Sequence, residues 1–294
     1  MTSLRRRLWM DFAAVIAISV AIIVPMQFFL FNVVVGKLWP IKFTAQGMIT
    51  RDASTFLVHV TATVFVLVMV TIVYASLRGK ISRGPYQPAE FLRKNWGVWT
   101  IGWFMVTLAV NGVFFVYPGM AGLMAMWDYH VGVEGKAPLI VDVVAHQWGW
   151  SVSYPQFGVY GVGQLELPIH KTAKIIVTSQ DVYHSFWVPA FGFKLSAIPG
   201  ENRVMYATPI RLGTGTALVM GNFKDDGSAL DAKASANNYQ TGDPLLRVQC
   251  SWDCGMGHPV MRFPANIVSW KDFKSWAKGA QIVNKAIGDG SHYF

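Results

Sequence analysis

The stretch CSWDCGMGHPVM, residues 250–261, is the part of this chain around which the rest can be interpreted. It holds both cysteines of the protein together with a histidine and a methionine, in the spacing Cys-x3-Cys-x3-His-x2-Met. Thiolate, imidazole and thioether groups are the ligands that soft copper selects, and a weak methionine ligand beside cysteine and histidine is typical of electron-transfer sites. The pattern therefore predicts a copper site on a loop.

The second cysteine decides which kind of copper site is expected. One cysteine with this histidine and methionine would indicate a mononuclear blue-copper loop, whereas two thiolates can bridge two copper ions that share one electron. Two alternatives stay open at this point. A disulfide between Cys250 and Cys254 would suit an oxidising compartment. Zinc could use two cysteines and two histidines, but it has no use for Met261, so the spacing favours copper.

The loop resembles the dinuclear CuA loop of cytochrome c oxidase subunit II. Two further stretches follow that family's order: HQWGWS at residues 146–151, and DVYHSFWVP at residues 181–189, which continues to Lys194 and to AIPG at 197–200. Together the three motifs cover about residues 140 to 270. The resemblance implies a Greek-key cupredoxin-like domain that holds copper between loops at one end of a rigid scaffold.

The resemblance also implies the roles of individual residues. The ligand set would comprise two bridging thiolates, two imidazoles, a thioether and a backbone carbonyl, supplied by Cys250, Cys254, His184, His258, Met261 and Trp252. The earlier histidine and the methionine would complete one copper, and the loop histidine and the carbonyl would complete the other. Trp148 matches the tryptophan at which the family receives electrons from its donor.

Three positions depart from the family's pattern. The family usually has glutamate at the position of Trp252, and its carboxylate also reaches a magnesium or manganese ion shared with subunit I. Tryptophan cannot ligate a hard cation, so the resemblance gives no support for magnesium here. A tryptophan at this place also resembles the CuA loop of nitrous oxide reductase. Gly149 replaces the usual tyrosine of the aromatic patch, and Ser196 stands where aspartate is common, near the contact with subunit I.

Composition indicates a membrane protein. Of the 294 residues 53% are hydrophobic and only 14% are charged, which is too apolar for an ordinary soluble domain. The net charge of +9 is uneven, since residues 1–126 hold 11 Lys+Arg and 3 Asp+Glu, whereas residues 127–294 hold 14 and 13. The positive excess thus belongs to the apolar half, where it sets orientation. Nothing indicates a nucleic-acid surface.

Residues 1–127 are predicted to form a membrane anchor with three transmembrane helices, at about 12–35, 56–77 and 96–117. The first run could be a signal peptide, but it is longer than a signal's apolar region, which favours a retained helix. The last two helices match the family's hairpin. The basic segment between them should be cytoplasmic. This places the N-terminus in the cytoplasm and the C-terminal domain outside a bacterial or archaeal plasma membrane. His59 is interpreted as a packed or interfacial histidine.

Residues 128–294 are predicted to form the external domain, an all-β sandwich of short strands separated by turn residues. The expected strands are 139–144, 149–154, 165–167, 174–178, 201–207 and 216–221. Residues 222–243 are expected to form a long loop, and residues 270–285 a short amphipathic helix.

The first functional hypothesis is therefore subunit II of a heme-copper terminal oxidase. The chain would take single electrons from a soluble donor, a cytochrome c or a small copper protein, and pass them to a heme in subunit I. There oxygen is reduced to water and protons are pumped, so this chain itself needs no oxygen site. The expected partners are subunit I, subunit III and membrane lipid.

Two alternatives remain: the CuA subunit of a nitric oxide reductase, and a membrane-anchored copper-delivery protein. The aromatic patch around Trp148 argues against the second, since a carrier needs no point at which electrons arrive. Quinol oxidases of the same superfamily are excluded by the copper ligands, which their subunit II lacks.

Overall fold

The computed structural model describes residues 3–38, 42–81, 94–131, 137–215 and 242–287. It forms two compact units, one of residues 1–39 and 52–123 and the other of residues 40–51 and 124–294. The expected strand at 216–221 and nearly all of the expected loop at 222–243 lie outside the described residues. The division of the chain after residue 127 stays a prediction.

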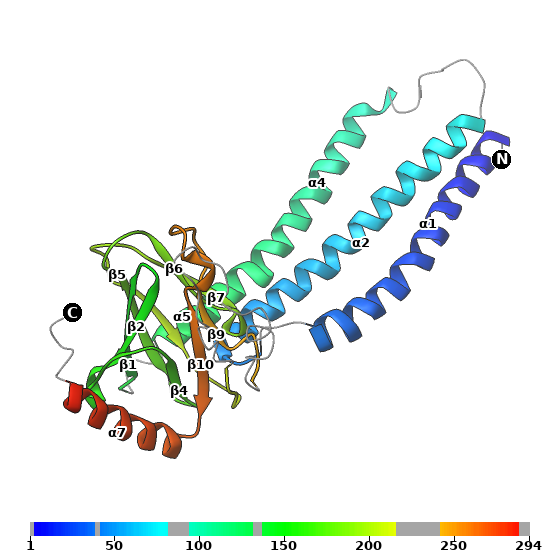
Figure 1. The fold of residues 1–294 in the computed structure, drawn as a ribbon. Coiled ribbons are helices and arrows are strands. Elements are labelled where there is room, and N and C mark those ends of the chain that lie inside the picture. Colours follow the sequence, from blue (N-terminus) through cyan, green and yellow to red (C-terminus); the bar gives the residue numbers. More distant parts are fainter. Residues whose placement is uncertain (1–2, 39–41, 82–93, 132–136, 216–241, 288–294) are drawn as a thin grey trace. The chain divides into compact units, whose positions relative to one another are not determined.

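Three long apolar spans supply the membrane-type helices, as the sequence predicts: Trp9–Val35, Ala45–Arg78 and Trp96–Met126. The elements that build them are α1 (Ser3–Phe29), η1 (Leu30–Leu38), α2 (Ala45–Ile81), α4 (Trp96–Phe114), η2 (Phe115–Met120) and α5 (Ala121–Val131). Their apolar side chains are largely exposed, as expected of helices whose solvent is lipid. Figure 1 labels α1, α2, α4 and α5.

Two boundaries differ from the expectation. Residues 45–54, expected in a loop, form the beginning of α2, because the hydroxyl of Thr44 accepts a hydrogen bond from the Gly47 N–H over 3.0 Å and caps the helix. In the third span, Tyr117 leaves helical geometry with φ −139° and ψ 128°, because the following Pro118 favours an extended backbone at this residue. The chain then resumes as α5.

Polar contacts join α1 to α2. The amide of Gln27 donates to the His59 carbonyl over 2.8 Å and to the Thr63 hydroxyl over 2.6 Å, and its oxygen contacts the His59 ring. Asp11 accepts a hydrogen bond from Tyr74 over 2.7 Å. These contacts support the interpretation of His59 as a packed histidine and identify Gln27 as its partner.

The other unit is a β-sandwich of two five-stranded sheets, with strand orders β3-β2-β1-β5-β8 and β4-β10-β9-β6-β7. The strands are β1 (Leu139–His146), β2 (Gly149–Tyr154), β3 (Val159–Val162), β4 (Leu165–Pro168), β5 (Ala173–Ser179), β6 (His184–Val188), β7 (Phe193–Ala197), β8 (Arg203–Ala207), β9 (Arg247–Cys250) and β10 (Arg262–Val268). Two pairs, β1 with β5 and β4 with β10, are parallel, and the others are antiparallel. The predicted fold class is confirmed.

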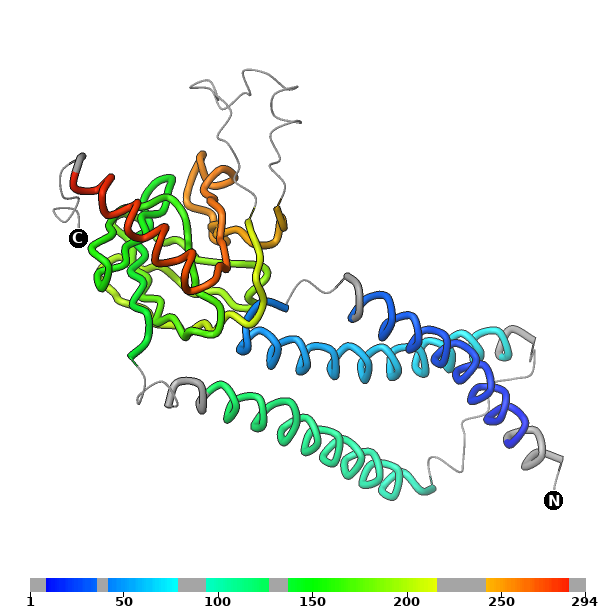
Figure 2. Tube along the Cα trace, turned by 90° about the horizontal axis from the view of Figure 1, so that it is seen from below, coloured from blue at the N-terminus to red at the C-terminus, as the bar shows by residue number. Residues whose placement is uncertain are grey.

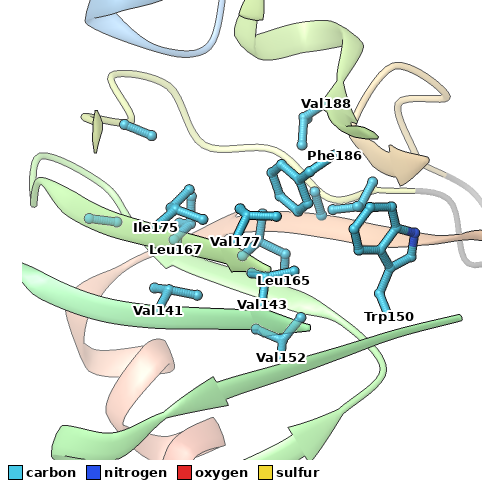
Figure 3. Packing of buried hydrophobic residues seen from close by; sticks show 14 of the residues in the cluster. Val141, Val143, Trp150, Val152, Leu165, Leu167, Ile175, Val177, Phe186 and Val188 are labelled. Carbon is cyan, nitrogen blue, oxygen red and sulfur yellow. The ribbon is translucent and has the colours of Figure 1, made fainter. Parts of the chain in front are cut away.

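Alternating side chains of both sheets fill the space between them. Strand β5 alternates buried and half-buried residues along its whole length, the period-two pattern of a strand with one buried face. Figure 3 shows Val143 and Val177 of one sheet among Phe186 and Leu165 of the other. The tightly packed core gives the loops at its end a rigid base.

Two segments complete this unit. Helix α7 (Trp270–Ile287), which confirms the expected amphipathic helix, buries Phe273 and Ala277 and contacts β3 and β4; Figure 2 shows it beside the strands. Phe43 is part of the same core, and the hydroxyl of Thr44 donates to the Phe191 carbonyl over 3.1 Å. The chain just before α2 is thus anchored in the β-sandwich.

Candidate metal centre

The loop of residues 251–261 leaves the sheet from β9 and returns to it in β10. A hydrogen bond from the Cys250 N–H to the Met261 carbonyl, over 3.1 Å, closes its base. Strand β6 lies on the other side of β9, with Phe186 opposite Cys250. Ser251 N–H donates to the Ser185 carbonyl over 3.0 Å. This pairing brings His184, which begins β6, next to the loop.

The other four predicted ligand groups lie around the two cysteine sulfurs. Cys250 Sγ lies 3.8 Å from His184 Nδ1 and 3.1 Å from the Trp252 carbonyl oxygen. Cys254 Sγ lies 3.6 Å from His258 Nδ1 and 3.8 Å from Met261 Sδ. Ligand atoms of His184, Cys250 and Cys254 all lie within 4.8 Å of one another. Coordination of copper by this set stays a prediction.

The donor set fits a soft metal. Both cysteines are free and buried, and Met261 and His184 are 1% and 0% exposed. Burial, followed by the adjacent Cys250, raises the pKa of the Cys254 thiol to about 12. Two neighbouring thiolates therefore need a cation to compensate their charge. A buried thioether beside thiols and imidazoles matches copper better than zinc.

Asp181 fixes the orientation of the His184 ring, and sequence reasoning did not assign it a role. Its Oδ1 lies 2.9 Å from His184 Nε2, and its carboxylate accepts the N–H groups of Gln147 and Val182, each over 2.6 Å. Although burial alone would raise the pKa of Asp181, these hydrogen bonds lower it. An ionised Asp181 places the proton on His184 Nε2 and leaves the Nδ1 lone pair facing Cys250.

Trp148 lies against the same loop. Its indole N–H donates to the Cys254 carbonyl over 3.1 Å, and the Gln147 side chain donates to the same oxygen over 2.8 Å. Gly257 makes room for the ring, since a Cβ there would approach Trp148 Cδ2 to 2.3 Å. Trp148 remains 38% exposed. The indole of Trp148 therefore reaches from the protein surface to the backbone carbonyl of Cys254, a predicted ligand residue.

The side chain of Trp252 lies apart from the sulfurs. Its ring is 55% exposed and packs against Tyr183, with the ring centroids 4.8 Å apart. The Tyr183 hydroxyl donates to the Ser196 hydroxyl over 2.5 Å. Only the backbone of Trp252 therefore takes part in the predicted ligand set, as the sequence predicts.

Comparisons with known proteins agree with the motifs. A profile of the family "Cytochrome C oxidase subunit II, periplasmic domain" matches residues 161–214. Cytochrome c oxidase subunit 2 of Thermostichus vulcanus is 30% identical over 155 residues, which are 52% of this chain and 37% of that protein. Cytochrome bo(3) ubiquinol oxidase subunit 2 of Buchnera aphidicola is 24% identical over 260 residues, 84% of this chain and 75% of that protein.

Among solved structures, the periplasmic domain of subunit II of cytochrome oxidase of Bradyrhizobium japonicum is 25% identical, with a TM-score of 0.37, over 50% of this chain and 95% of that one. The chain spans just over a third of the length of the cytochrome c oxidase subunits 2 of Thermostichus vulcanus and Bacillus subtilis, 37% and 34%. The sequence matches confirm the resemblance to subunit II of cytochrome c oxidase.

Proposed function

We propose that this chain, a relative of cytochrome c oxidase subunit II, receives electrons for a membrane heme-copper oxidase. A soluble donor delivers single electrons at Trp148. The centre formed by Cys250, Cys254 and their neighbours holds each electron, which then passes to a heme in subunit I. Reduction of oxygen to water and proton pumping take place on that subunit.

One observation carries the proposal: two free, buried thiols surrounded by two imidazole Nδ1 atoms, a thioether and a carbonyl. A bound copper pair supplies one-electron storage with little change of geometry between redox states. The protein keeps this environment rigid, because the loop is closed at its base by the Cys250–Met261 hydrogen bond and stands on a packed β-sandwich.

Each surrounding residue has a task in this account. Asp181 holds the proton of His184 at Nε2, so that Nδ1 stays available as a ligand. Buried Met261 excludes water from the sulfurs. The hydrogen bond from Trp148 to the Cys254 carbonyl gives a short connection from the exposed indole to a bridging cysteine.

The surface on which electrons leave is proposed to include Trp252, Tyr183 and Ser196. These residues form a contiguous group through one ring contact and one hydrogen bond, and the Trp252 carbonyl is a predicted ligand. Since Trp252 replaces the family's glutamate, the contact with subunit I is expected to form without a shared magnesium ion. The three apolar spans anchor the chain beside that subunit, with the N-terminus in the cytoplasm.

The relatives named as quinol oxidase subunits cover more of this chain than the cytochrome c oxidase subunits do. The copper ligands separate the two functions, since a quinol oxidase does not need them. A second candidate function is the CuA subunit of a nitric oxide reductase. Trp252 supports it, because the absence of the family's glutamate at this position favours a divergent complex.

Purification of the tagged full-length chain from its own membranes in mild detergent tests the proposal. We expect a heme-containing large subunit to co-purify and the complex to reduce oxygen at the expense of a reduced soluble electron carrier. A complex that reduces nitric oxide and not oxygen would favour the second candidate. A chain that carries copper, has no heme partner and hands its copper to acceptor proteins would refute both.

A further inference from the structure

A hollow of about 260 Å³ opens beside Trp148. Trp148, Trp150, Gly163 and Arg262 are among the residues that line it. Gly163, where an added Cβ would meet no atom within 4 Å, leaves space at this hollow, whereas a Cβ at Gly149 would lie 2.6 Å from the His146 ring. The absent side chain of Gly163 thus leaves space at a hollow that the proposed electron-receiving ring also lines.

The hollow carries a positive charge that no described carboxylate compensates. The ion pairs of the described residues involve Arg78, Arg203 and His184, and none involves Arg262. Arg262 is exposed at the start of β10. A free guanidinium beside an aromatic ring is a preferred binding partner for a carboxylate.

Two described carboxylates near the loop, those of Asp181 and Asp253, accept hydrogen bonds within the protein. Asp181 accepts hydrogen bonds from His184 and from two backbone N–H groups, and Asp253 accepts one from the Gly255 N–H over 3.1 Å. These hydrogen bonds stabilise both carboxylates, and among the described residues no ion pair involves Asp253 or Arg262. Arg262 is nevertheless the one charged residue among the described residues that line the hollow beside Trp148.

We propose that this hollow receives an acidic side chain of the soluble electron donor and so places the donor against Trp148. This inference rests on the proposed function. It specifies in addition that the electron donor carries an acidic patch around its redox centre. One electron leaves the donor and one is gained by the centre behind Trp148, and no proton or covalent bond is exchanged. Charges at the edge of such an interface act mainly on the association rate.

The test uses the full-length, copper-loaded chain in detergent and follows its reduction by stopped-flow spectroscopy. Three reductants serve as probes: a reduced acidic cupredoxin, a reduced basic cytochrome c and the uncharged durohydroquinone. Arg262→Gln removes the charge, and Gly163→Leu fills the hollow from a position with free space. Lys278→Gln and Gly279→Leu, both on the exposed side of α7, make matched changes elsewhere.

We expect the acidic probe to react faster than the basic one at low ionic strength. Arg262→Gln and Gly163→Leu should each lower its second-order rate constant about tenfold, with both controls unchanged. Durohydroquinone should reduce all five proteins at the same rate. Equal rates with the acidic probe for both variants and their controls, or a faster reaction with the basic probe, would overturn the proposal. Failure of the unsubstituted chain to accept electrons from durohydroquinone would overturn the proposed function, and the docking proposal with it.

Discussion

Nε2 of His184 lies 2.9 Å from Oδ1 of Asp181, while Nδ1 of the same ring lies 3.8 Å from the sulfur of Cys250. One carboxylate thus determines which nitrogen faces the predicted metal. Hydrogen-bonded partners of this kind orient a ligand and raise its basicity. The same Asp181 also accepts the Gln147 N–H, so it ties the ligand histidine to the segment that carries Trp148.

Asp181→Asn should weaken copper binding. The amide can accept fewer hydrogen bonds than the carboxylate and carries no charge, so His184 loses its fixed tautomer. We expect copper affinity to fall about tenfold or more, measured by competition with a Cu(I) chelator at neutral pH. Glu201→Gln, a change at an exposed turn, is the control. Equal affinities for the two variants would show that Asp181 does not position the ligand.

The two methionines of the loop should differ sharply. Met261 is 1% exposed and lies 3.8 Å from Cys254 Sγ, whereas Met256 is 93% exposed. Leucine nearly conserves the volume of methionine but supplies no thioether. Met261→Leu should therefore change the visible absorption and the reduction potential of the copper-loaded chain, and Met256→Leu should leave both unaltered. A spectrum insensitive to Met261→Leu would remove this residue from the ligand set.

Gly257→Ala should disturb the contact between the loop and Trp148. The added Cβ would lie 2.3 to 2.7 Å from ring atoms, so the ring or the loop must move, at a cost of about 1–3 kcal/mol. Thermal unfolding and tryptophan fluorescence of the full chain would report it. Gly279→Ala, in open space on α7, should instead stabilise by about 0.5–1 kcal/mol. Equal melting temperatures for the two variants would contradict the steric argument.

Glu166 should make stability depend on pH. Burial raises the pKa of this carboxyl, against a smaller opposite effect of the hydrogen bond from Asn266. Above the ordinary pKa of 4.5 the unfolded chain loses the proton while the folded chain still holds it. Glu166 therefore stabilises the fold fully below pH 4.5 and loses this contribution as pH rises through the raised pKa.

Denaturant unfolding of the full chain at several pH values measures this contribution. The stability of Glu166→Gln relative to the original chain should increase as pH rises from about 4.5. Glu201→Gln, at an exposed position, serves as the control and should show no such trend. A difference between Glu166→Gln and the original chain that stays constant over pH would refute the assignment.

The sequence alone suggested the candidate ligand groups, but not the residues that support them. Cys250, Cys254, His258 and Met261 follow from a local spacing, because the loop that carries them is one continuous segment. Asp181 stands three residues before His184 and could have been found from the habit of metal-binding histidines to bond a carboxylate. The hollow beside Trp148 could not, since Gly163 in the turn between β3 and β4 and Arg262 at the start of β10 are brought together only by the tertiary fold.

The helices were predictable from hydropathy, whereas their polar ends were not. Residues 45–54 are too polar to extend an apolar run, yet the Thr44 cap starts a helix there. The short strands β3, β7 and β9 have four or five residues each. They are stabilised by pairing partners distant in sequence, which no local pattern contains.

The most direct test of the central claim is the optical and EPR spectrum of the copper-loaded full-length chain in detergent, with copper counted per chain. The account predicts a purple species with two copper ions per chain and a hyperfine pattern from one electron shared by both nuclei. One colourless Cu(I) per chain that cannot be oxidised and reduced reversibly would contradict it and would leave the copper-delivery hypothesis standing.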